Sequence, residues 1–219
     1  MTEYVFKRTD NALELVGNFE GLYQAEVDPW QQSAAIPSPM SIYYQFSRAR
    51  LALALASHGM SKCEGVEFGC GLGYSTATLA EVLNCKMVGI DKSPTAVQRA
   101  AVLHPICKFA LGDLSSPAFS AMMQFDFGIL GQMLWYVLPE IDTAIRNALS
   151  CIRLGGIFAV SQSFLRSKQL YGAEIADGFN GTLSLFLKRY PQRLQLIAAQ
   201  YDDTGVLCHN DGLLIFRVK

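Results

Sequence analysis

Residues 66–76 read VEFGCGLGYST, and this stretch decides the fold of the chain. An apolar run that contains Glu67 is followed by glycines at every second position and then by a helical run from Tyr74 to Leu83. Glycine allows a sharp turn and lets a ligand approach the backbone. The N–H groups that open a helix form a polar cradle. Strand, glycine turn and helix together predict a nucleotide-type cofactor site.

The spacing of the glycines narrows the type of nucleotide. A dinucleotide fingerprint, G-x-G-x-x-G, would need its third glycine at Tyr74 or at Thr76. A phosphate-binding loop needs G-x-x-x-x-G-K-[ST], which does not occur. The pattern that is present is Glu-x-Gly-x-Gly-x-Gly, so an NAD-binding oxidoreductase is disfavoured.

Composition excludes several other classes of protein. The chain has 219 residues, of which 51% are apolar and 17% charged, as expected for one compact domain with a sizeable core. The net charge is −1 and no Lys/Arg block occurs, which argues against nucleic-acid binding. No apolar run is long enough for a membrane span, and the N-terminus does not resemble a signal peptide, so we expect no membrane association and a cytoplasmic location. Six cysteines without a C-x-x-C pair and three scattered histidines predict free thiols and no metal site.

Strands and helices alternate after the glycine turn, as a parallel sheet with right-handed crossovers requires. Two final strands, 194–201 and 213–218, have no helix between them and predict an antiparallel pair. Residues 1–60 are expected to form an N-terminal cap or lid, with a helix over 42–57 that is capped by Ser41 and packs through Ile42, Phe46, Ala49 and Leu53. Residues 61–219 are expected to form the cofactor-binding domain, in one structural unit with the cap. The intervening strands are predicted at 86–91, 107–111, 125–131 and 157–161.

Several positions resemble the class I S-adenosylmethionine (SAM)-dependent methyltransferases. Glu67 and the three glycines match motif I of that family, and Asp91, twenty positions after Gly71, matches its ribose-binding acid. Asp113 matches the acid that meets adenine. The resemblance implies an α/β fold, Rossmann-like and doubly wound, with a seven-stranded mostly parallel sheet whose last strand is antiparallel, plus the helical cap. It implies SAM as cofactor and S-adenosylhomocysteine (SAH) as product. The expected cofactor-binding residues are Arg48, Glu67, Gly69, Gly71, Gly73, Asp91, Lys92, Asp113, Leu114 and Gly131.

Further segments resemble a smaller group, the nodulation-factor N-methyltransferases. Leu22-Tyr23 followed by Asp28-Pro29-Trp30 is similar to the entry segment of that group, and residues 130–136 are similar to the segment after its fourth strand. Tyr44 and Arg48 are similar to its Tyr-x-x-x-basic pattern. The group methylates an amino sugar of an oligosaccharide. Here Gln132 stands where an acid is usual, which departs from the pattern.

Methyl transfer from a sulfonium is an in-line displacement, so alignment and exclusion of water are the main requirements. A hydroxyl acceptor needs a general base, whereas an amine that arrives neutral does not. No base follows the fourth strand, because Gln132 cannot take up a proton. The catalytic residue is left open, with Gln132, Trp135 and Tyr136 as candidates. The residues expected to bind substrate are Tyr23, Trp30, Tyr44, Trp135 and Tyr136.

Each of these residues also has an ordinary structural interpretation. Asp91 could cap a helix, Asp113 could be a turn residue, Arg48 could be solvated or could pair with Glu67, and the aromatic residues could belong to the core. The preferred function is SAM-dependent methylation of a small-molecule acceptor, with an amine on a sugar or natural product favoured. The alternatives are O-methylation of a hydroxyl or carboxylate, and a non-catalytic SAM-fold binding protein. A homodimer is left open, and residues 20–45 with the loop in 164–193 are expected to cover the substrate.

Overall fold

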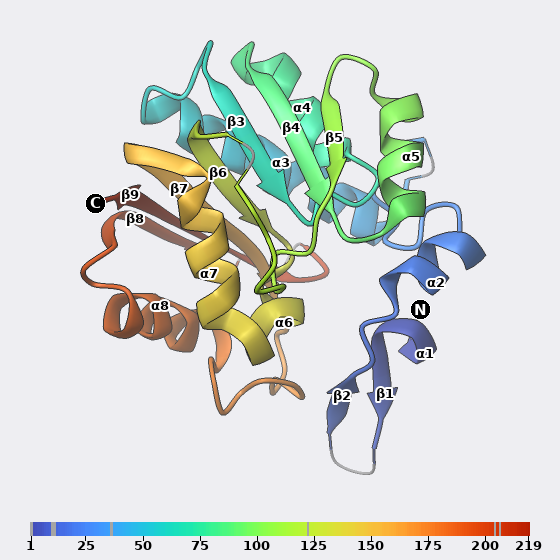
Figure 1. The fold of residues 1–219 in the computed structure, drawn as a ribbon. Coiled ribbons are helices and arrows are strands. Elements are labelled where there is room, and N and C mark those ends of the chain that lie inside the picture. The colour runs from blue at the N-terminus through green and yellow to red at the C-terminus, as the bar shows by residue number, and fades with distance from the viewer. Residues whose placement is uncertain (1, 10–11, 36, 122, 204, 206) are drawn as a thin grey trace.

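The computed structural model describes residues 2–9, 12–35, 37–121, 123–203, 205 and 207–219 (Figure 1). The helices are α1 (Thr2–Val5), α2 (Phe19–Ala25), α3 (Pro39–Ser57), α4 (Tyr74–Leu83), α5 (Pro94–Leu103), α6 (Leu134–Val137), the 3-10 turn η1 (Leu138–Glu140), α7 (Ile141–Ser150) and α8 (Gly178–Arg189). The strands are β1 (Phe6–Arg8), β2 (Leu13–Leu15), β3 (Glu64–Phe68), β4 (Lys86–Asp91), β5 (Lys108–Leu111), β6 (Phe125–Gly131), β7 (Ile152–Phe164), β8 (Leu194–Asp202) and β9 (Asn210–Val218).

Seven strands form one sheet in the order β5-β4-β3-β6-β7-β9-β8. The pairs β3–β4, β3–β6, β4–β5 and β6–β7 are parallel, and β9 is antiparallel to both of its neighbours. The sequence order reverses between β3 and β6, so the carboxyl ends of these two strands flank the point where a doubly wound sheet binds ligands. The predicted sheet with its antiparallel last strand is confirmed.

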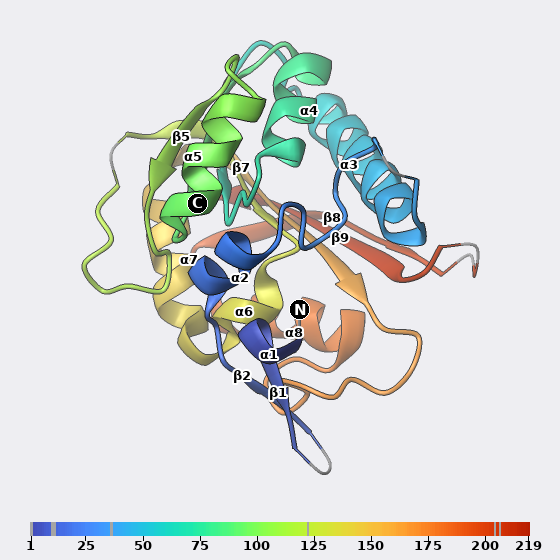
Figure 2. The ribbon, with the colours of Figure 1, turned by 90° about the vertical axis from the view of Figure 1, so that its right-hand side faces the viewer.

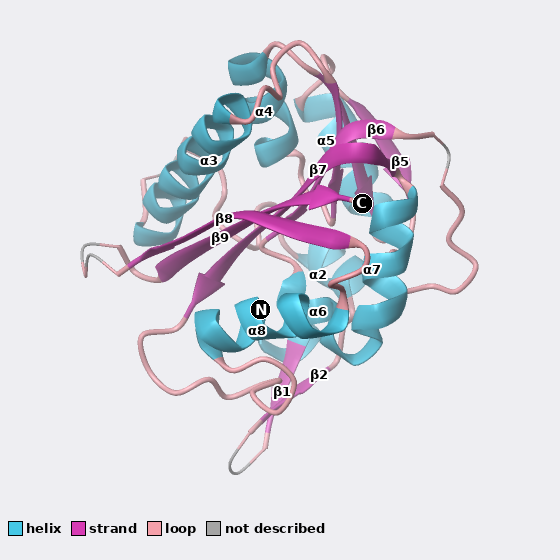
Figure 3. Cartoon of the chain, turned by 90° about the vertical axis from the view of Figure 1, so that its left-hand side faces the viewer, coloured by secondary structure: helices cyan, strands magenta, loops and turns pink. Residues whose placement is uncertain are grey.

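Helices cover both faces of this sheet. Leu55 of α3 and Leu79 of α4 pack on one face with Ile129 of β6 and Ile157 of β7. The other face packs against α7 and α8, which contribute Ala148 and Phe186 among others. Figure 2 shows α3, α4 and α5 side by side, and Figure 3 shows α7 and α8 on the opposite side of the sheet. Because the strands are covered on both faces, they are apolar over most of their length, as in other parallel sheets.

The long helix α3 begins earlier than predicted and packs through a different face. Its N-cap is Ser38, which forms a capping box with Ser41, so the prediction of Ser41 as the cap was wrong. The predicted packing face was also wrong, because Ile42 is 54% exposed and Leu53 is 72% exposed. The buried face instead carries polar groups beside apolar ones, as at Ser47, because they meet polar partners on the sheet.

The first sixty residues contain the helices α1, α2 and α3 and also a feature that was not predicted. Strands β1 and β2 pair antiparallel in a separate two-stranded sheet, which projects beside the body (Figure 1). The hairpin touches the loop after β7, since Leu13 N–H donates to the Leu170 carbonyl at 3.2 Å and the Phe6 and Tyr171 rings lie 5.1 Å apart. The hairpin therefore packs against a loop that lies more than 150 positions later in the sequence.

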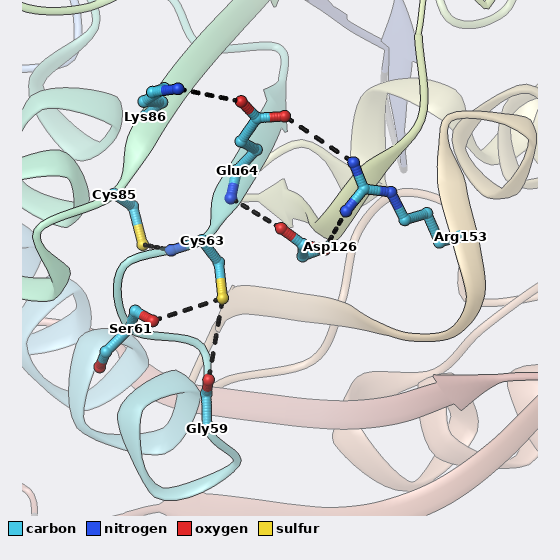
Figure 4. A network of polar contacts seen from close by, with 8 residues as sticks. All are labelled: Gly59, Ser61, Cys63, Glu64, Cys85, Lys86, Asp126 and Arg153. Carbon is cyan, nitrogen blue, oxygen red and sulfur yellow. Dashed lines mark hydrogen bonds and ion pairs between the residues drawn. The ribbon is translucent and has the colours of Figure 1, made fainter.

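Charged side chains fasten the amino ends of the strands, at the edge of the sheet away from the glycine turn (Figure 4). The Glu64 backbone N–H donates to Asp126 Oδ2 at 2.9 Å. Arg153 forms ion pairs with both Glu64 and Asp126, and Lys86 pairs with Glu64 at 3.4 Å. These contacts join β3, β4, β6 and β7 where the strands begin.

All six cysteines are free thiols, four of them buried, with Cys63 half-buried and Cys208 exposed. Within the described ranges, no set of three or more His, Cys, Asp and Glu side chains is arranged to hold a metal ion. None of the helices that the structure describes combines the length and the apolar character needed to cross a membrane.

Candidate active site

A cavity opens at the carboxyl ends of β3, β4, β5 and β6, and α2 and the segment after it form part of its wall. Its empty volume, counted with the open solvent at its mouth, is about 810 Å³. Of the predicted residues, the cavity brings together Tyr23, Trp30, Tyr44, Gly69, Gly71, Asp91, Lys92, Asp113, Leu114, Gly131, Gln132 and Tyr136.

The glycine turn after β3 needs its glycines for two reasons. Gly69 and Gly71 have φ of 68° and 54°, which side-chain-bearing residues rarely adopt. In addition, a Cβ on Gly71 would lie 2.4 Å from Tyr23 Oη, and a Cβ on Gly69 would lie 2.0 Å from Met133 Sδ. The turn therefore leaves room for neighbouring side chains as well as for a ligand. Gly73, also predicted, is the N-cap of α4 and does not line the cavity.

Asp91 ends β4 and is 7% exposed. Its Oδ2 accepts the Gly71 backbone N–H at 2.8 Å, and its Oδ1 accepts the Ser93 N–H at 2.9 Å. Burial raises the pKa of Asp91, while these two backbone bonds oppose the rise. Each carboxylate oxygen keeps a second lone pair. Asp91 can therefore hold the turn and accept two further donors from a ligand.

Lys92, Asp113 and Leu114 line the cavity next to Asp91. Lys92 Nζ and Asp113 Oδ2 are 3.2 Å apart, with both side chains partly exposed. Asp113 Oδ1 also accepts the Ser115 N–H at 2.9 Å. Leu114 is 4% exposed and supplies an apolar surface beside these charges. This part of the wall can meet a flat ring that carries a polar edge.

Glu67 and Arg48 lie in a smaller polar hollow that shares Gly69, Gly131 and Gln132 with the main cavity. Glu67 is 3% exposed and accepts a short hydrogen bond from the Thr76 hydroxyl. Burial raises the pKa of Glu67, and the Arg48 charge opposes that rise. Arg48 Nη2 donates to the Gln32 carbonyl at 3.1 Å. The hollow thus presents both a negative and a positive side chain, as a zwitterionic ligand requires.

Gln132 follows β6 in a left-handed backbone conformation, with φ of 56°. Its Nε2 donates to Tyr43 Oη at 3.1 Å and to Ser47 Oγ at 3.2 Å, and its Oε1 accepts the Ser163 N–H at 2.8 Å. Tyr43 and Ser47 also donate to Asp211, at 2.7 and 3.0 Å. The Gln132 side chain is therefore held in place by hydrogen bonds to α3 and β7, and these bonds fix the carboxyl end of β6.

The rest of the wall is aromatic. The Tyr136 ring lies 5.1 Å from Phe19 and 5.8 Å from Trp30, and Trp30 Nε1 donates to Tyr23 Oη at 3.0 Å. Burial raises the pKa of Tyr23 and of Tyr136, and it raises that of Tyr44 to about 12. These hydroxyls therefore stay protonated at neutral pH and are poor proton acceptors.

The structure does not bring Trp135 to this cavity. Its indole N–H donates to the Ser163 carbonyl at 3.1 Å, and its ring packs edge-on against Phe164 at 5.5 Å. No residue of 164–193 lines the cavity within the part of the chain that the structure describes. The loop of that segment instead contacts the β1–β2 hairpin.

Sequence reasoning missed several lining residues. Phe19 and Gln32 lie in the irregular N-terminal segment, while Met133 and Val137 flank Tyr136. Helix α6, which follows β6, has only four residues. Its sequence is too short for a periodic pattern to show which residues face the cavity and which face the core. Only one feature of the sequence could have indicated Met133 as a lining residue. Met133 directly follows Gln132 at the carboxyl end of a strand that lies next to the glycine turn.

Comparisons with known proteins agree with this geometry. Residues 66–160 match the family described as Methyltransferase domain. The N-methyltransferase NodS of Bradyrhizobium japonicum WM9, solved with SAH, is 21% identical, covers 91% of this chain and 97% of its own, and has a TM-score of 0.69. The magnesium protoporphyrin IX methyltransferase ChlM of Synechocystis PCC 6803, solved with SAM, is 15% identical, with coverages of 92% and 93% and a TM-score of 0.65.

A third solved structure is a TehB-like SAM-dependent methyltransferase of Corynebacterium glutamicum ATCC 13032 Kitasato, 18% identical, with coverages of 79% and 88% and a TM-score of 0.58. At these identities the likeness concerns the fold, while the domain match includes the glycine turn, Asp91 and Asp113. Residues 66–160 therefore contain a methyltransferase domain, and the chain as a whole has the fold of the solved SAM-dependent methyltransferases.

Proposed function

We propose that this methyltransferase transfers the methyl group of SAM to a neutral nitrogen of a small-molecule acceptor. The observation that carries the proposal is the chemistry of the wall around Tyr136 and Gln132. Of the residues described there, the aromatic ones hold their protons, Gln132 is an amide, and no histidine is among them. A neutral amine can attack the methyl group without a general base, whereas a hydroxyl acceptor requires one.

A carboxylate acceptor also needs no base, but it needs a positive partner. Of the described cations of the site, Lys92 pairs with Asp113, and Arg48 lies in the hollow that we assign to the methionine end of SAM. The aromatic wall of Phe19 and Tyr136 attracts cations and repels anions through the ring faces. These features support an amine over a carboxylate. We infer an amine on a sugar or natural product, a class that the resemblance to nodulation-factor N-methyltransferases also favours.

SAM would supply an activated methyl group, and the chain supplies its orientation and its shelter from water. We assign Asp91 to the ribose hydroxyls and the wall of Asp113 and Leu114 to the adenine. Arg48 and Glu67 are assigned to the methionine end, where the polar hollow offers one charge of each sign. Tyr23, Trp30, Tyr44 and Tyr136 are assigned to the space for the acceptor. Alignment of this kind contributes up to roughly 7–11 kcal/mol of the barrier in ideal systems.

Residues 1–60 are proposed to act as the lid of the SAM-binding unit 61–219. Phe19, Tyr23 and Trp30, which belong to this segment, form part of the cavity wall. Deleting the N-terminal forty residues is therefore expected to abolish methyl transfer while the sheet still forms. Transfer at the full rate by a folded truncated protein would contradict the lid assignment.

The test begins with calorimetric titration of the purified protein with SAM, SAH and, as a control, NAD. We expect micromolar binding of the first two and none of NAD. Transfer of a tritiated methyl group is then measured over matched panels of amines, alcohols and carboxylates. An amine acceptor should give a rate that rises with pH through the pKa of the amine, because only the neutral form attacks. Transfer confined to hydroxyls, or to carboxylates without that pH dependence, would refute N-methylation.

A further inference from the structure

Helix α2 forms part of the cavity wall yet belongs to the N-terminal segment. Phe19 and Tyr23 of this helix line the cavity, and Figure 2 shows α2 next to the end of α5. A cofactor bound against the glycine turn would lie beside Tyr23, whose hydroxyl packs on Gly71. Because Tyr23 and Phe19 line the cavity, a movement of α2 away from the body would widen the path by which SAM enters and SAH leaves. The contacts that hold α2 in place therefore bear on cofactor exchange.

One side chain of α2, that of Glu20, makes several polar contacts with the body. Glu20 Oε2 accepts the Ser93 hydroxyl at 2.6 Å and the Thr95 N–H at 3.2 Å. Its Oε1 accepts the Thr95 hydroxyl at 2.6 Å. Gln24, one turn further along α2, donates to the same Oε1 at 2.7 Å and orients the carboxylate. These partners lie at the start of α5, where a negative charge is also favoured by the helix dipole.

The same contacts reach the site through Ser93. Ser93 Oγ accepts the Ala96 N–H at 3.0 Å as the N-cap of α5 while it donates to Glu20. The Ser93 backbone N–H donates to Asp91, whose other oxygen accepts the Gly71 N–H. Glu20 is thus linked by one residue to the carboxylate assigned to the ribose. It does not line the cavity.

We propose that Glu20 is a positioning residue that fastens α2 over the cofactor cavity and sets the rates at which SAM enters and SAH leaves. This inference rests on the proposed placement of SAM. The carboxylate is partly accessible to water, so water can replace its partners and the fastening is reversible. A second contact, from Arg99 Nη1 to the Glu26 carbonyl at 2.8 Å, lies at the C-terminal end of α2. Glu20 makes its contacts at the N-terminal end of the helix, next to Phe19.

The experiment compares cofactor exchange in full-length Glu20→Gln, Thr95→Val and wild-type protein. Each protein is loaded with tritiated SAM and chased with unlabelled SAM, and association is followed by stopped-flow fluorescence. Glu20→Gln should release SAM roughly five to ten times faster, because charge-assisted bonds are replaced by neutral ones at a partly exposed position. Thr95→Val should act in the same direction, and the double variant should show less than the product of the two effects.

Two readouts separate fastening from mere structural damage. Loss of the fastening should raise the association rate as well as the release rate, so Kd should rise by less than the release rate does. Damage to the pocket would raise Kd and the release rate together. Glu14→Gln, an exposed change on β2 in the same segment, is the matched control and should leave both rates within experimental error.

The outcomes distinguish this inference from the proposed function. Wild-type protein that binds neither SAM nor SAH would overturn the placement of SAM. Wild-type binding with unchanged exchange rates in Glu20→Gln would overturn the role of Glu20 alone. If Glu20→Gln does not fold, as judged by circular dichroism, Thr95→Val carries the same test because it keeps the side-chain shape and the Thr95 N–H.

Discussion

Gly71→Ala tests how tightly the glycine turn fits under α2. The substitution adds one methyl group at a residue with φ of 54°, at a point 2.4 Å from Tyr23 Oη. The left-handed backbone costs a residue with a side chain about 1–2 kcal/mol. Overpacking adds about 1–3 kcal/mol, because Tyr23 is 3% exposed and its hydroxyl is held by Trp30. We therefore expect the free energy of unfolding to fall by about 2–5 kcal/mol.

Two companion variants separate these contributions. Gly59→Ala has the same backbone problem, with φ of 82°, but its Cβ would meet nothing within 4 Å, so it should cost only about 1–2 kcal/mol. Tyr23→Phe removes the hydroxyl and leaves the nearest ring carbon 3.5 Å from the new Cβ, which is an ordinary contact. The double variant Gly71→Ala/Tyr23→Phe should therefore cost about 1–3 kcal/mol less than the sum of the single changes.

Urea unfolding followed by far-ultraviolet circular dichroism gives these free energies without relying on Trp30 fluorescence. The reasoning is refuted if Gly71→Ala lowers the free energy of unfolding no more than Gly59→Ala does. That result would mean that α2 can move away from the turn without destabilising the protein. It is equally refuted if Tyr23→Phe gives no rescue. SAM titration of the same variants shows whether the turn that fits Tyr23 is also the turn that binds the cofactor, in which case Gly71→Ala weakens binding.

Three further results are expected. Asp91→Asn should raise the Kd of SAM by about 10–100-fold, because it removes a charged acceptor that is worth about 1.5–3 kcal/mol; calorimetry that gives the wild-type Kd would contradict the ribose assignment. Bonds from Ser93 and Thr95 lower the pKa of Glu20 from 4.5 to about 2. Its stabilisation is therefore complete above pH 4.5 and is lost as the pH falls towards 2, so the difference in unfolding free energy between wild type and Glu20→Gln should shrink over that range; a constant difference in urea unfolding would count against it. Asp211→Ala should lower the free energy of unfolding by about 3–5 kcal/mol, because it leaves the Arg50 guanidinium, 2.6 Å from Asp211 Oδ2, without its buried partner; a urea midpoint close to that of wild type would disprove this.

The parts of the fold that could be predicted are those in which local sequence and position in the sheet agree. The glycine turn could be predicted because its backbone conformation is unfavourable for residues other than glycine. Asp91 could be placed because a parallel strand must end at the same edge as the glycine turn. The direction of the strands, but not their order in the sheet, followed from their alternation with helices and from the helix-free final pair.

Polar contacts between residues far apart in the chain could not be predicted from the sequence. The buried face of α3 was misassigned because Tyr43 and Ser47 are buried through bonds to Asp211, more than 160 positions later, and no hydrophobic period reveals that pairing. Tyr136 meets the cavity while Trp135 packs against Phe164, a division that a helix of four residues does not encode. The β1–β2 hairpin consists of strands of three residues, too short for an alternating pattern to be seen.

The position of β9 has a consequence for how the protein is made. β9 is the last of the sheet's strands to leave the ribosome, yet it lies between β7 and β8. Until it emerges, β8 has no partner in the sheet, and the polar face of α3 lacks Asp211. In the nascent chain, β8 and that face of α3 therefore stay without these partners until residues 210–218 have been synthesised, and a stop codon before residue 210 would leave both without them.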